Sequence, residues 1–177
     1  MTIRAFEEIH PQLAKDVYVD DLALVLGDVE IGPDSSIWPF SVVRGDVNSI
    51  RIGARSNLQD NCVVHVSHDS YYSPGGYATV IGDEVTVGHQ VILHGCQVGD
   101  RCLIGMGSVV MDGVTIEPET ILGAGSIVTQ DKILSGGYLW LGRPAKRIRA
   151  LTQAEREQLL YSAQHYVRLK NRHLNSR

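Results

Sequence analysis

The stretch TVIGDEVTVGHQVILHGCQV, residues 79–98, returns an aliphatic residue every six positions, at Ile81, Val87 and Leu93. A six-residue period fits neither an α-helix, which has about 3.6 residues per turn, nor a strand of alternating side chains. It is typical of a parallel β-helix, in which short strands and tight turns repeat and each aliphatic side chain points into a stacked core. The stretch therefore predicts a solenoid of hexapeptide repeats.

The same period extends over most of the chain. It breaks near residues 45–50 and again in the polar, aromatic stretch 67–77, and one residue is lost after Leu93. Glycine often follows the aliphatic residue, and Gly, Asn and Asp suit the corner conformations of such turns. Because three steps form one triangular coil in hexapeptide proteins, we expect about six coils. The other repeat positions are Val19, Val25, Ile31, Ile37, Val43, Ile52, Leu58, Val64, Val98, Ile104, Val110, Ile116, Leu122, Val128 and Leu134.

The repeat ends at residues 141–147, where Pro144 cannot donate to another rung of the ladder. Thr152 and Glu155 then form a capping-box pattern, which predicts one helix to about Leu174. We expect a β-helix domain over residues 1–150 and a C-terminal helix over 151–177, packed on it or on a neighbouring subunit. The helix face predicted to pack consists of Leu159, Leu160, Ala163, Tyr166, Val167 and Leu174.

The composition narrows the class of protein. The chain has 177 residues and a net charge of -4, which favours one globular domain and gives no reason to expect nucleic acid or an anionic membrane as partner. No apolar run approaches the roughly 20 residues of a membrane span, and the N-terminus lacks the apolar core of a secretory signal. Cys62, Cys96 and Cys102 form no CxxC pair. We therefore expect free, buried thiols and a cytoplasmic location.

Three histidines stand on the repeat and form the candidate metal site. His65 and His94 each follow an aliphatic repeat position by one residue, whereas His89 follows its own by two. Because His89 is offset, one chain would struggle to bring all three to a point, and two subunits would do so more easily. Three imidazoles suit a catalytic metal that keeps one coordination position open. The alternative is that these histidines form only hydrogen bonds across a subunit contact.

A wider set of motifs resembles the γ-class carbonic anhydrase family. The resemblance runs from about residue 10 to residue 175 and is closest to the compact bacterial branch of that family. A hexapeptide repeat alone would not be specific, but this combination is. The motifs are Ile37-Trp-Pro39, Val43-Arg-Gly-Asp46, Ile52-Gly53, Asn57-Leu-Gln-Asp60, Val64-His65, Val87-Gly-His89, Leu93-His-Gly-Cys96 and Ile104-Gly-Met-Gly107.

The resemblance implies a fold, an assembly and a reaction. The fold is a left-handed parallel β-helix, and the assembly is a homotrimer with a metal at each subunit interface. His65 and His94 of one subunit and His89 of its neighbour hold Zn²⁺, with Fe²⁺ as the other candidate, since imidazole suits both metals. A water in the fourth position, whose pKa Zn²⁺ lowers to about 7, then attacks CO₂ to give bicarbonate. The activity is that of a lyase.

The resemblance also assigns roles around the metal. Gln59 matches the residue that orients the hydroxide, and Tyr166 is a weaker match to a tyrosine that lines the pocket. Arg44 matches a family arginine that forms intersubunit ion pairs with Asp46 and Asp60. Each residue has a structural alternative: Gln59 satisfies a backbone group, Tyr166 packs, and the charged residues hold an interface together.

One departure from the family affects the expected rate. The archetypal enzymes carry acidic loops that supply a glutamate as proton shuttle. Here the loop 67–78 is short and contains Asp69 but no glutamate, and Val47 stands where the archetype has an acid. Release of the proton from metal-bound water relies on a positioned acid–base group. The resemblance therefore implies a metal site without implying fast CO₂ hydration.

Three alternative functions stay open at this point. A hexapeptide acyltransferase uses the same β-helix, and the segment 141–146, LGRPAK, occurs in both groups. A metal-dependent thioesterase would use the same metal on another carbonyl. A trimer that has lost its activity would keep the metal for stability, consistent with the missing shuttle. Bound metal separates acyl transfer from the others, and turnover separates an enzyme from a binding protein.

Overall fold

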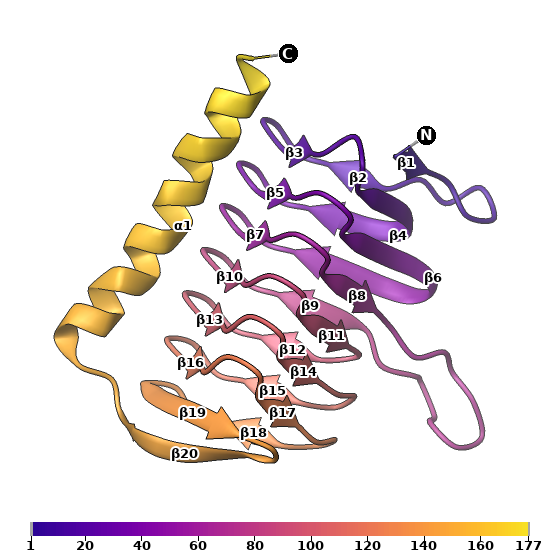
Figure 1. Cartoon of the computed structure of the whole chain (residues 1–177). Coiled ribbons are helices and arrows are strands. Elements are labelled where there is room, and N and C mark those ends of the chain that lie inside the picture. The colour runs from indigo at the N-terminus through magenta and orange to yellow at the C-terminus, as the bar shows by residue number, and fades with distance from the viewer. Residues whose placement is uncertain (1, 177) are drawn as a thin grey trace.

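The predicted parallel β-helix is present in the computed structural model, which describes residues 2–176 (Figure 1). Each coil contributes a short strand to each of three faces. One face is a separate sheet, in which seven parallel strands stack over the described residues, one more than the six coils expected. These are β3 (Tyr18–Val19), β5 (Ser36–Ile37), β7 (Asn57–Leu58), β10 (Thr86–Val87), β13 (Leu103–Ile104), β16 (Ile121–Leu122) and β19 (Tyr138–Gly142).

The other two faces belong to one 12-stranded sheet, because β4 (Leu24–Ile31) and β6 (Val42–Ile52) bend around the corner between them. The second face also contains β1 (Ile3–Arg4), β8 (Val63–His65), β11 (Ile92–His94), β14 (Val109–Val110) and β17 (Ile127–Val128). The third face contains β2 (Gln12–Leu13), β9 (Thr79–Ile81), β12 (Gln97–Val98), β15 (Thr115–Ile116) and β18 (Ile133–Leu134).

The core consists of the aliphatic side chains that the six-residue period predicts. Val25, Leu58 and Leu93, for example, are fully buried in one continuous cluster. The three cysteine thiols are unpaired and buried in the same cluster, as expected. Burial raises the pKa of each thiol to about 12, so these thiols are unreactive near neutral pH.

The two breaks in the period are corners of unusual shape. At the first, β4 pairs with β6 through Gly27 and Gly45, and the register then shifts so that Val29 faces Ile50. Gly27 has a φ of 79°, and a Cβ there would lie 2.1 Å from the carbonyl oxygen of Gly45, so only glycine fits. At the second, residues 67–77 leave the solenoid as a loop, and Ser67 and Tyr77 exchange two backbone hydrogen bonds at its base (Figure 1).

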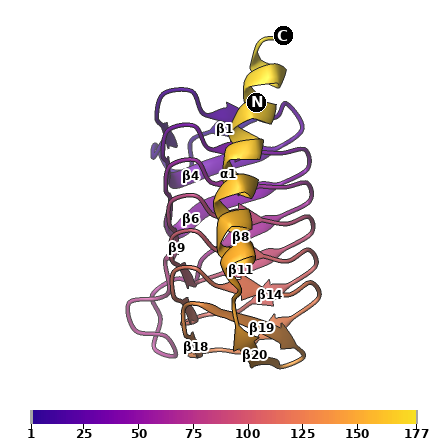
Figure 2. The same cartoon turned by 90° about the vertical axis from the view of Figure 1, so that its left-hand side faces the viewer.

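The solenoid ends in an antiparallel hairpin followed by a helix. β19 pairs with β20 (Ala145–Ala150), and Pro144 lies in the turn between them. The helix α1 spans Gln153–Leu174, and the capping box of Thr152 and Glu155 is present as predicted. α1 runs back along the face formed by β3 to β19 (Figure 2). Thr86 of β10 and Ser162 of α1 are joined by a hydrogen bond of 3.1 Å.

The packed face of α1 is narrower than the sequence predicts. Leu159 and Ala163 are buried, but Leu160 and Leu174 are 36% and 37% exposed in the single chain, so only part of the predicted face packs on the solenoid. A helix lying on a flat sheet buries a single stripe, and Leu160 is turned about 100° away from Leu159. The stripe instead includes Lys170, whose fully buried ammonium donates to the Asp16 carbonyl oxygen at 2.6 Å and to Asp34 Oδ1 at 2.8 Å.

Within residues 2–176, none of the helical structure combines the length and the apolar character of a bilayer-spanning segment.

Candidate metal centre

His65 and His94 lie side by side at the corner between the second and third faces. Each is the last residue of its strand, and the parallel register of β8 and β11 pairs them directly. His65 Nδ1 and His94 Nε2 face each other at 3.0 Å. A tetrahedral Zn²⁺ with bonds of about 2.0–2.1 Å would hold two such nitrogens roughly 3.3 Å apart. The observed separation is close to that value.

The outer nitrogen of each ring contacts a carboxylate. His65 Nε2 lies 3.0 Å from Asp46 Oδ1, and His94 Nδ1 lies 2.6 Å from Asp112 Oδ1. A carboxylate in this position holds the ring proton on the nitrogen that it contacts. Each of the two facing nitrogens is then unprotonated and carries a lone pair. These lone pairs repel each other unless a cation lies between them. The donor set therefore fits a metal.

The surroundings of His65, above all its burial, favour the neutral form of the ring, which is the form that binds metals. Burial lowers the pKa of His65, and the positive charge of Arg44 acts in the same direction, against the hydrogen bond to Asp46. Burial on its own would raise the pKa of Asp46, but hydrogen bonds with His65 and Arg44 outweigh it, and the pKa is lowered. Asp46 is thus an ionised acceptor that both His65 and Arg44 contact.

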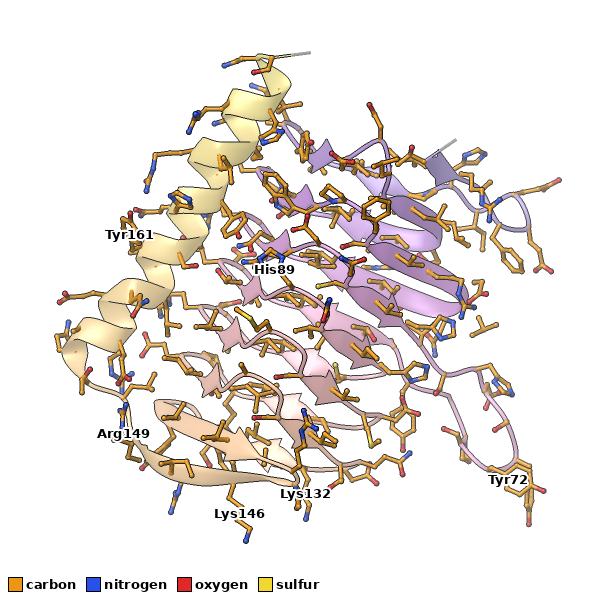
Figure 3. The ribbon with its side chains drawn as sticks, viewed as in Figure 1. Tyr72, His89, Lys132, Lys146, Arg149 and Tyr161 are labelled. Carbon is orange, nitrogen blue, oxygen red and sulfur yellow. The ribbon has the colours of Figure 1, made fainter. Side chains whose placement is uncertain are left out.

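His89 lies at a different corner, between the first and second faces (Figure 3). Its Nδ1 lies 2.9 Å from Asp60 Oδ2, and its side chain is 46% exposed. Within residues 2–176 of one chain, no three His, Cys, Asp or Glu side chains come together as a metal site. We call His65, His94, Asp46 and Asp112 the paired half-site, and His89 with Asp60 the single half-site. One chain thus holds two separate half-sites.

Gln59 and Tyr166 belong to the corner of the single half-site. Gln59 precedes Asp60, is 7% exposed, and donates from Nε2 to Asn57 Oδ1 at 3.3 Å. Tyr166 packs edge-on against Trp38, with ring centroids 5.6 Å apart. Burial, together with the negative charge of Asp60, raises the pKa of Tyr166. Both residues therefore keep a structural contact within the chain while lying near the single half-site.

Arg44 forms its ion pair with Asp46 in the same chain, and Asp60 pairs with His89. The expected ion pairs of Arg44 with Asp46 and Asp60 across subunits stay a prediction for the assembly.

Asp112 is a site residue that the sequence interpretation missed. Besides contacting His94, it accepts a hydrogen bond of 2.8 Å from Ser67 Oγ. A signal was available: Asp112 lies two residues after Val110, the repeat position that pairs with Leu93, and so reaches the corner of His94 on the next coil. Asp46 lies three residues after Val43, the repeat position that pairs with Val64, and so reaches the corner of His65 from the preceding coil.

Known proteins with the same sequence pattern identify the family. A model described as "Bacterial transferase hexapeptide (six repeats)" matches residues 78–110 and 95–130. Protein YrdA of Escherichia coli is 47% identical over 98% of this chain and 94% of its own length. Gamma carbonic anhydrase 2 of Arabidopsis thaliana is 45% identical over 92% of the chain and 58% of its own length. A probable carbonic anhydrase of Methanocaldococcus jannaschii is 41% identical over 89% of the chain and 94% of its own length.

The chain belongs to the γ-carbonic anhydrase family. Among solved structures, one relative of this γ-carbonic anhydrase-family chain is named for another activity. It is a putative acetyltransferase from Bacillus cereus, 39% identical, with a TM-score of 0.92 and coverage of 99% of this chain and 98% of its own. Membership of the γ-carbonic anhydrase family thus establishes the fold. Because relatives with this fold carry different activity names, the reaction depends on the residues of the site.

Proposed function

We propose that this chain is a carbonic anhydrase-like metalloenzyme that hydrates CO₂ to bicarbonate at the subunit interfaces of a homotrimer. The observation that carries the proposal is the pair of facing nitrogens, His65 Nδ1 and His94 Nε2, each backed by a carboxylate on its other side. The names of the relatives support the same reaction. The three unpaired, buried cysteines suit the reducing cytoplasm that we propose as its location.

In the trimer, His65 and His94 of one subunit and His89 of the partner subunit would hold the metal. Zn²⁺ is the first candidate and Fe²⁺ the second. When bound, Zn²⁺ lowers the pKa of a water to about 7 and so supplies a nucleophile at neutral pH. Asp60 contacts Nδ1 of His89, which leaves Nε2 on the exposed side of the ring to face a neighbouring subunit.

The residues around the ligands have separate roles in this proposal. Asp46 and Asp112 fix the ring orientation and the tautomer of His65 and His94. Gln59, carried beside the single half-site, would orient the attacking oxygen through its side-chain amide. Tyr166 would line the pocket, and Arg44 would keep Asp46 ionised.

Proton release would limit the rate. The loop 67–78 carries no glutamate, and its one aspartate, Asp69, already accepts a hydrogen bond of 2.7 Å from the backbone N–H of Gly75. Asp69 therefore stabilises the loop conformation. Residues 67–78 contain no glutamate that could carry the proton away.

The test combines metal content per subunit with stopped-flow CO₂ hydration. Protein purified without chelators is reloaded with Zn²⁺ or, anaerobically, with Fe²⁺, and compared with His89→Ala. We expect about one metal per subunit and measurable hydration in the wild type, and neither in a folded trimeric variant. Metal without hydration would contradict the reaction, and thioesters would be the next substrates. Absence of metal after reloading would contradict the site.

Acyl transfer is the second candidate, because the Bacillus cereus relative is named a putative acetyltransferase. A general-base histidine in such an enzyme needs no companion, whereas His65 and His94 come as a pair with matched carboxylates. Acetyl transfer from acetyl-CoA by metal-free protein would favour this candidate. A trimer that binds metal and turns over neither CO₂ nor thioesters would be a binding protein derived from the enzyme.

A further inference from the structure

The C-terminal end of the solenoid is only partly closed. The hairpin of β19 and β20 continues the first face, but β17 and β18 are the end strands of the larger sheet over the described residues. The inward side chains of these last strands, Val128 and Leu134, therefore have no further coil beneath them. A cavity of about 550 Å³ opens at this point.

The cavity has an apolar floor. Val128 and Leu134 are buried, and the indole of Trp140, which packs against the core, forms part of the wall. The Trp140 Nε1–H donates to the carbonyl oxygen of Ser135 at 3.2 Å, so its polar edge is already satisfied. What the indole offers a ligand is a rigid apolar face.

The rim of the cavity is basic. Lys132, Lys146 and Arg147 line it and are exposed. The guanidinium of Arg147 stacks over the Tyr138 ring at 4.8 Å. Of the lysines in residues 2–176, Lys15 and Lys170 form ion pairs, whereas Lys132 and Lys146 form none. Figure 3 shows these two side chains at the same end of the molecule.

The basic character extends over the whole closing segment. Residues 132–149, KILSGGYLWLGRPAKRIR, contain five Lys or Arg and no Asp or Glu, although the chain has a net charge of -4. Such a segregated positive end attracts anions. It also disfavours a contact between two copies of this chain through this same end, because like charges would meet.

We propose that this end cavity binds an amphipathic anion, an apolar chain or ring that carries a carboxylate or phosphate. The apolar part would lie against Trp140, Val128 and Leu134, and the anionic group would pair with Lys132 and Lys146. The site is separate from the paired half-site: Thr129, which lines the cavity, lies two coils after His94 in the strand register, which is about 10 Å along the solenoid. The proposal therefore stands or falls independently of the metal.

Tryptophan fluorescence provides a direct test, because the chain has two tryptophans. In Trp38→Phe protein, Trp140 is the sole emitter, and 8-bromooctanoate bound in the cavity is expected to quench it saturably. In Trp140→Phe protein, Trp38 beneath α1 should not be quenched. Equal quenching of both variants, or none in either, would overturn the proposal. Quenching should persist in His89→Ala, which excludes binding of the carboxylate to the metal.

Calorimetry with matched ligands tests the charge. We expect octanoate to bind at least tenfold more tightly than octan-1-ol or octyltrimethylammonium. The double variant K132M/K146M should bind octanoate at least tenfold more weakly, whereas Lys15→Met, at an exposed position, should bind as the wild type does. Unchanged affinity in the double variant would overturn the proposal. So would binding to phosphatidylglycerol vesicles without binding of monomeric octanoate, since it would indicate a lipid-surface contact.

Discussion

Asp112 Oδ1 lies 2.6 Å from His94 Nδ1, and Asp112 is on the next coil, 18 residues further along the chain. The carboxylate is fixed in turn by the Ser67 hydroxyl at 2.8 Å. The parallel register of β11 and β14 places Val110 on Leu93, and Asp112 lies in the turn that directly follows β14. The ring of His94 is therefore oriented before any metal binds.

Asp112→Asn should weaken Zn²⁺ binding about 10–100-fold while leaving the fold unchanged, because the carboxylate that holds the His94 tautomer is lost. Competition with a chromogenic chelator measures the affinity. The matched control is Asp131→Asn, at the same corner one coil later, whose backbone N–H donates to Asp112 O. Equal loss of affinity in both variants would refute the role of Asp112.

Mixing two inactive variants tests the division of the site between subunits. His89→Ala keeps the paired half-site, and His94→Ala keeps the single half-site. If the site is shared, random reassembly of an equal mixture restores both halves at about one interface in four of a closed ring. We expect metal content and hydration near a quarter of the wild-type values after joint refolding. A mixture as inactive as its components would mean that one chain carries the whole site.

Hydration should depend on external buffer. Because Asp69 is engaged in the loop and no glutamate lies in residues 67–78, the proton has to leave through a soluble acceptor. We expect the turnover number to rise several-fold between low and high imidazole concentration at constant pH and ionic strength, with little change in kcat/KM. A turnover number independent of buffer would point to an internal shuttle.

Lys170→Met should lower the free energy of unfolding by about 1–3 kcal/mol, because the Asp16 carbonyl oxygen and the Asp34 carboxylate lose their donor. Asp34 is partly exposed, so water recovers some of this loss. Urea titration gives the value. Lys132→Met, at an exposed position, should change it by less than about 0.5 kcal/mol. A comparable loss in both variants would contradict the role of the buried contact.

Acid should weaken the cap of α1. The bidentate ion pair with Arg149 and the hydrogen bonds with Thr152 lower the pKa of Glu155 from 4.5 to about 2. A group with a depressed folded-state pKa stabilises the fold above its unfolded pKa and loses this effect as pH falls from about 4.5 to about 2. The Tm difference between wild type and Glu155→Gln should shrink over that range. A difference that stays constant over that range would contradict the role of the ion pair.

The sequence predicted the solenoid well, because the physical cause of the fold repeats every six residues. Each aliphatic position has the same environment, so one correct register places Val25, Leu58 and Leu93 together. The left-handed sense of coiling came only with the family resemblance, since periodicity carries no handedness. The capping box of α1 was predictable because it is a local contact between Thr152 and Glu155.

Contacts between distant segments were less predictable. Lys170 looks like a surface residue in the sequence, and its burial depends on two oxygens more than 130 residues away. Leu160 matched an apolar pattern but lies outside the narrow stripe that touches the sheet. The pairing of His65 with His94 followed from their equivalent repeat positions. The offset of His89 in the repeat indicated that it lies apart from this pair, and its convergence with them on one metal across a subunit contact stays a prediction.

The corner between β8 and β9 also bears on how such a protein diversifies. His65 ends one strand and Thr79 begins the next, joined by a hydrogen bond of 2.6 Å from Thr79 Oγ1 to the His65 carbonyl oxygen. The intervening loop lies outside the stacked strands, and two backbone hydrogen bonds between Ser67 and Tyr77 close its base. Between Ser67, which holds Asp112, and Tyr77, the length and composition of the loop are therefore free to change over evolution without moving His65. Descendants of one ancestral protein can exchange this segment, and with it the surroundings of the corner, while inheriting the same histidines.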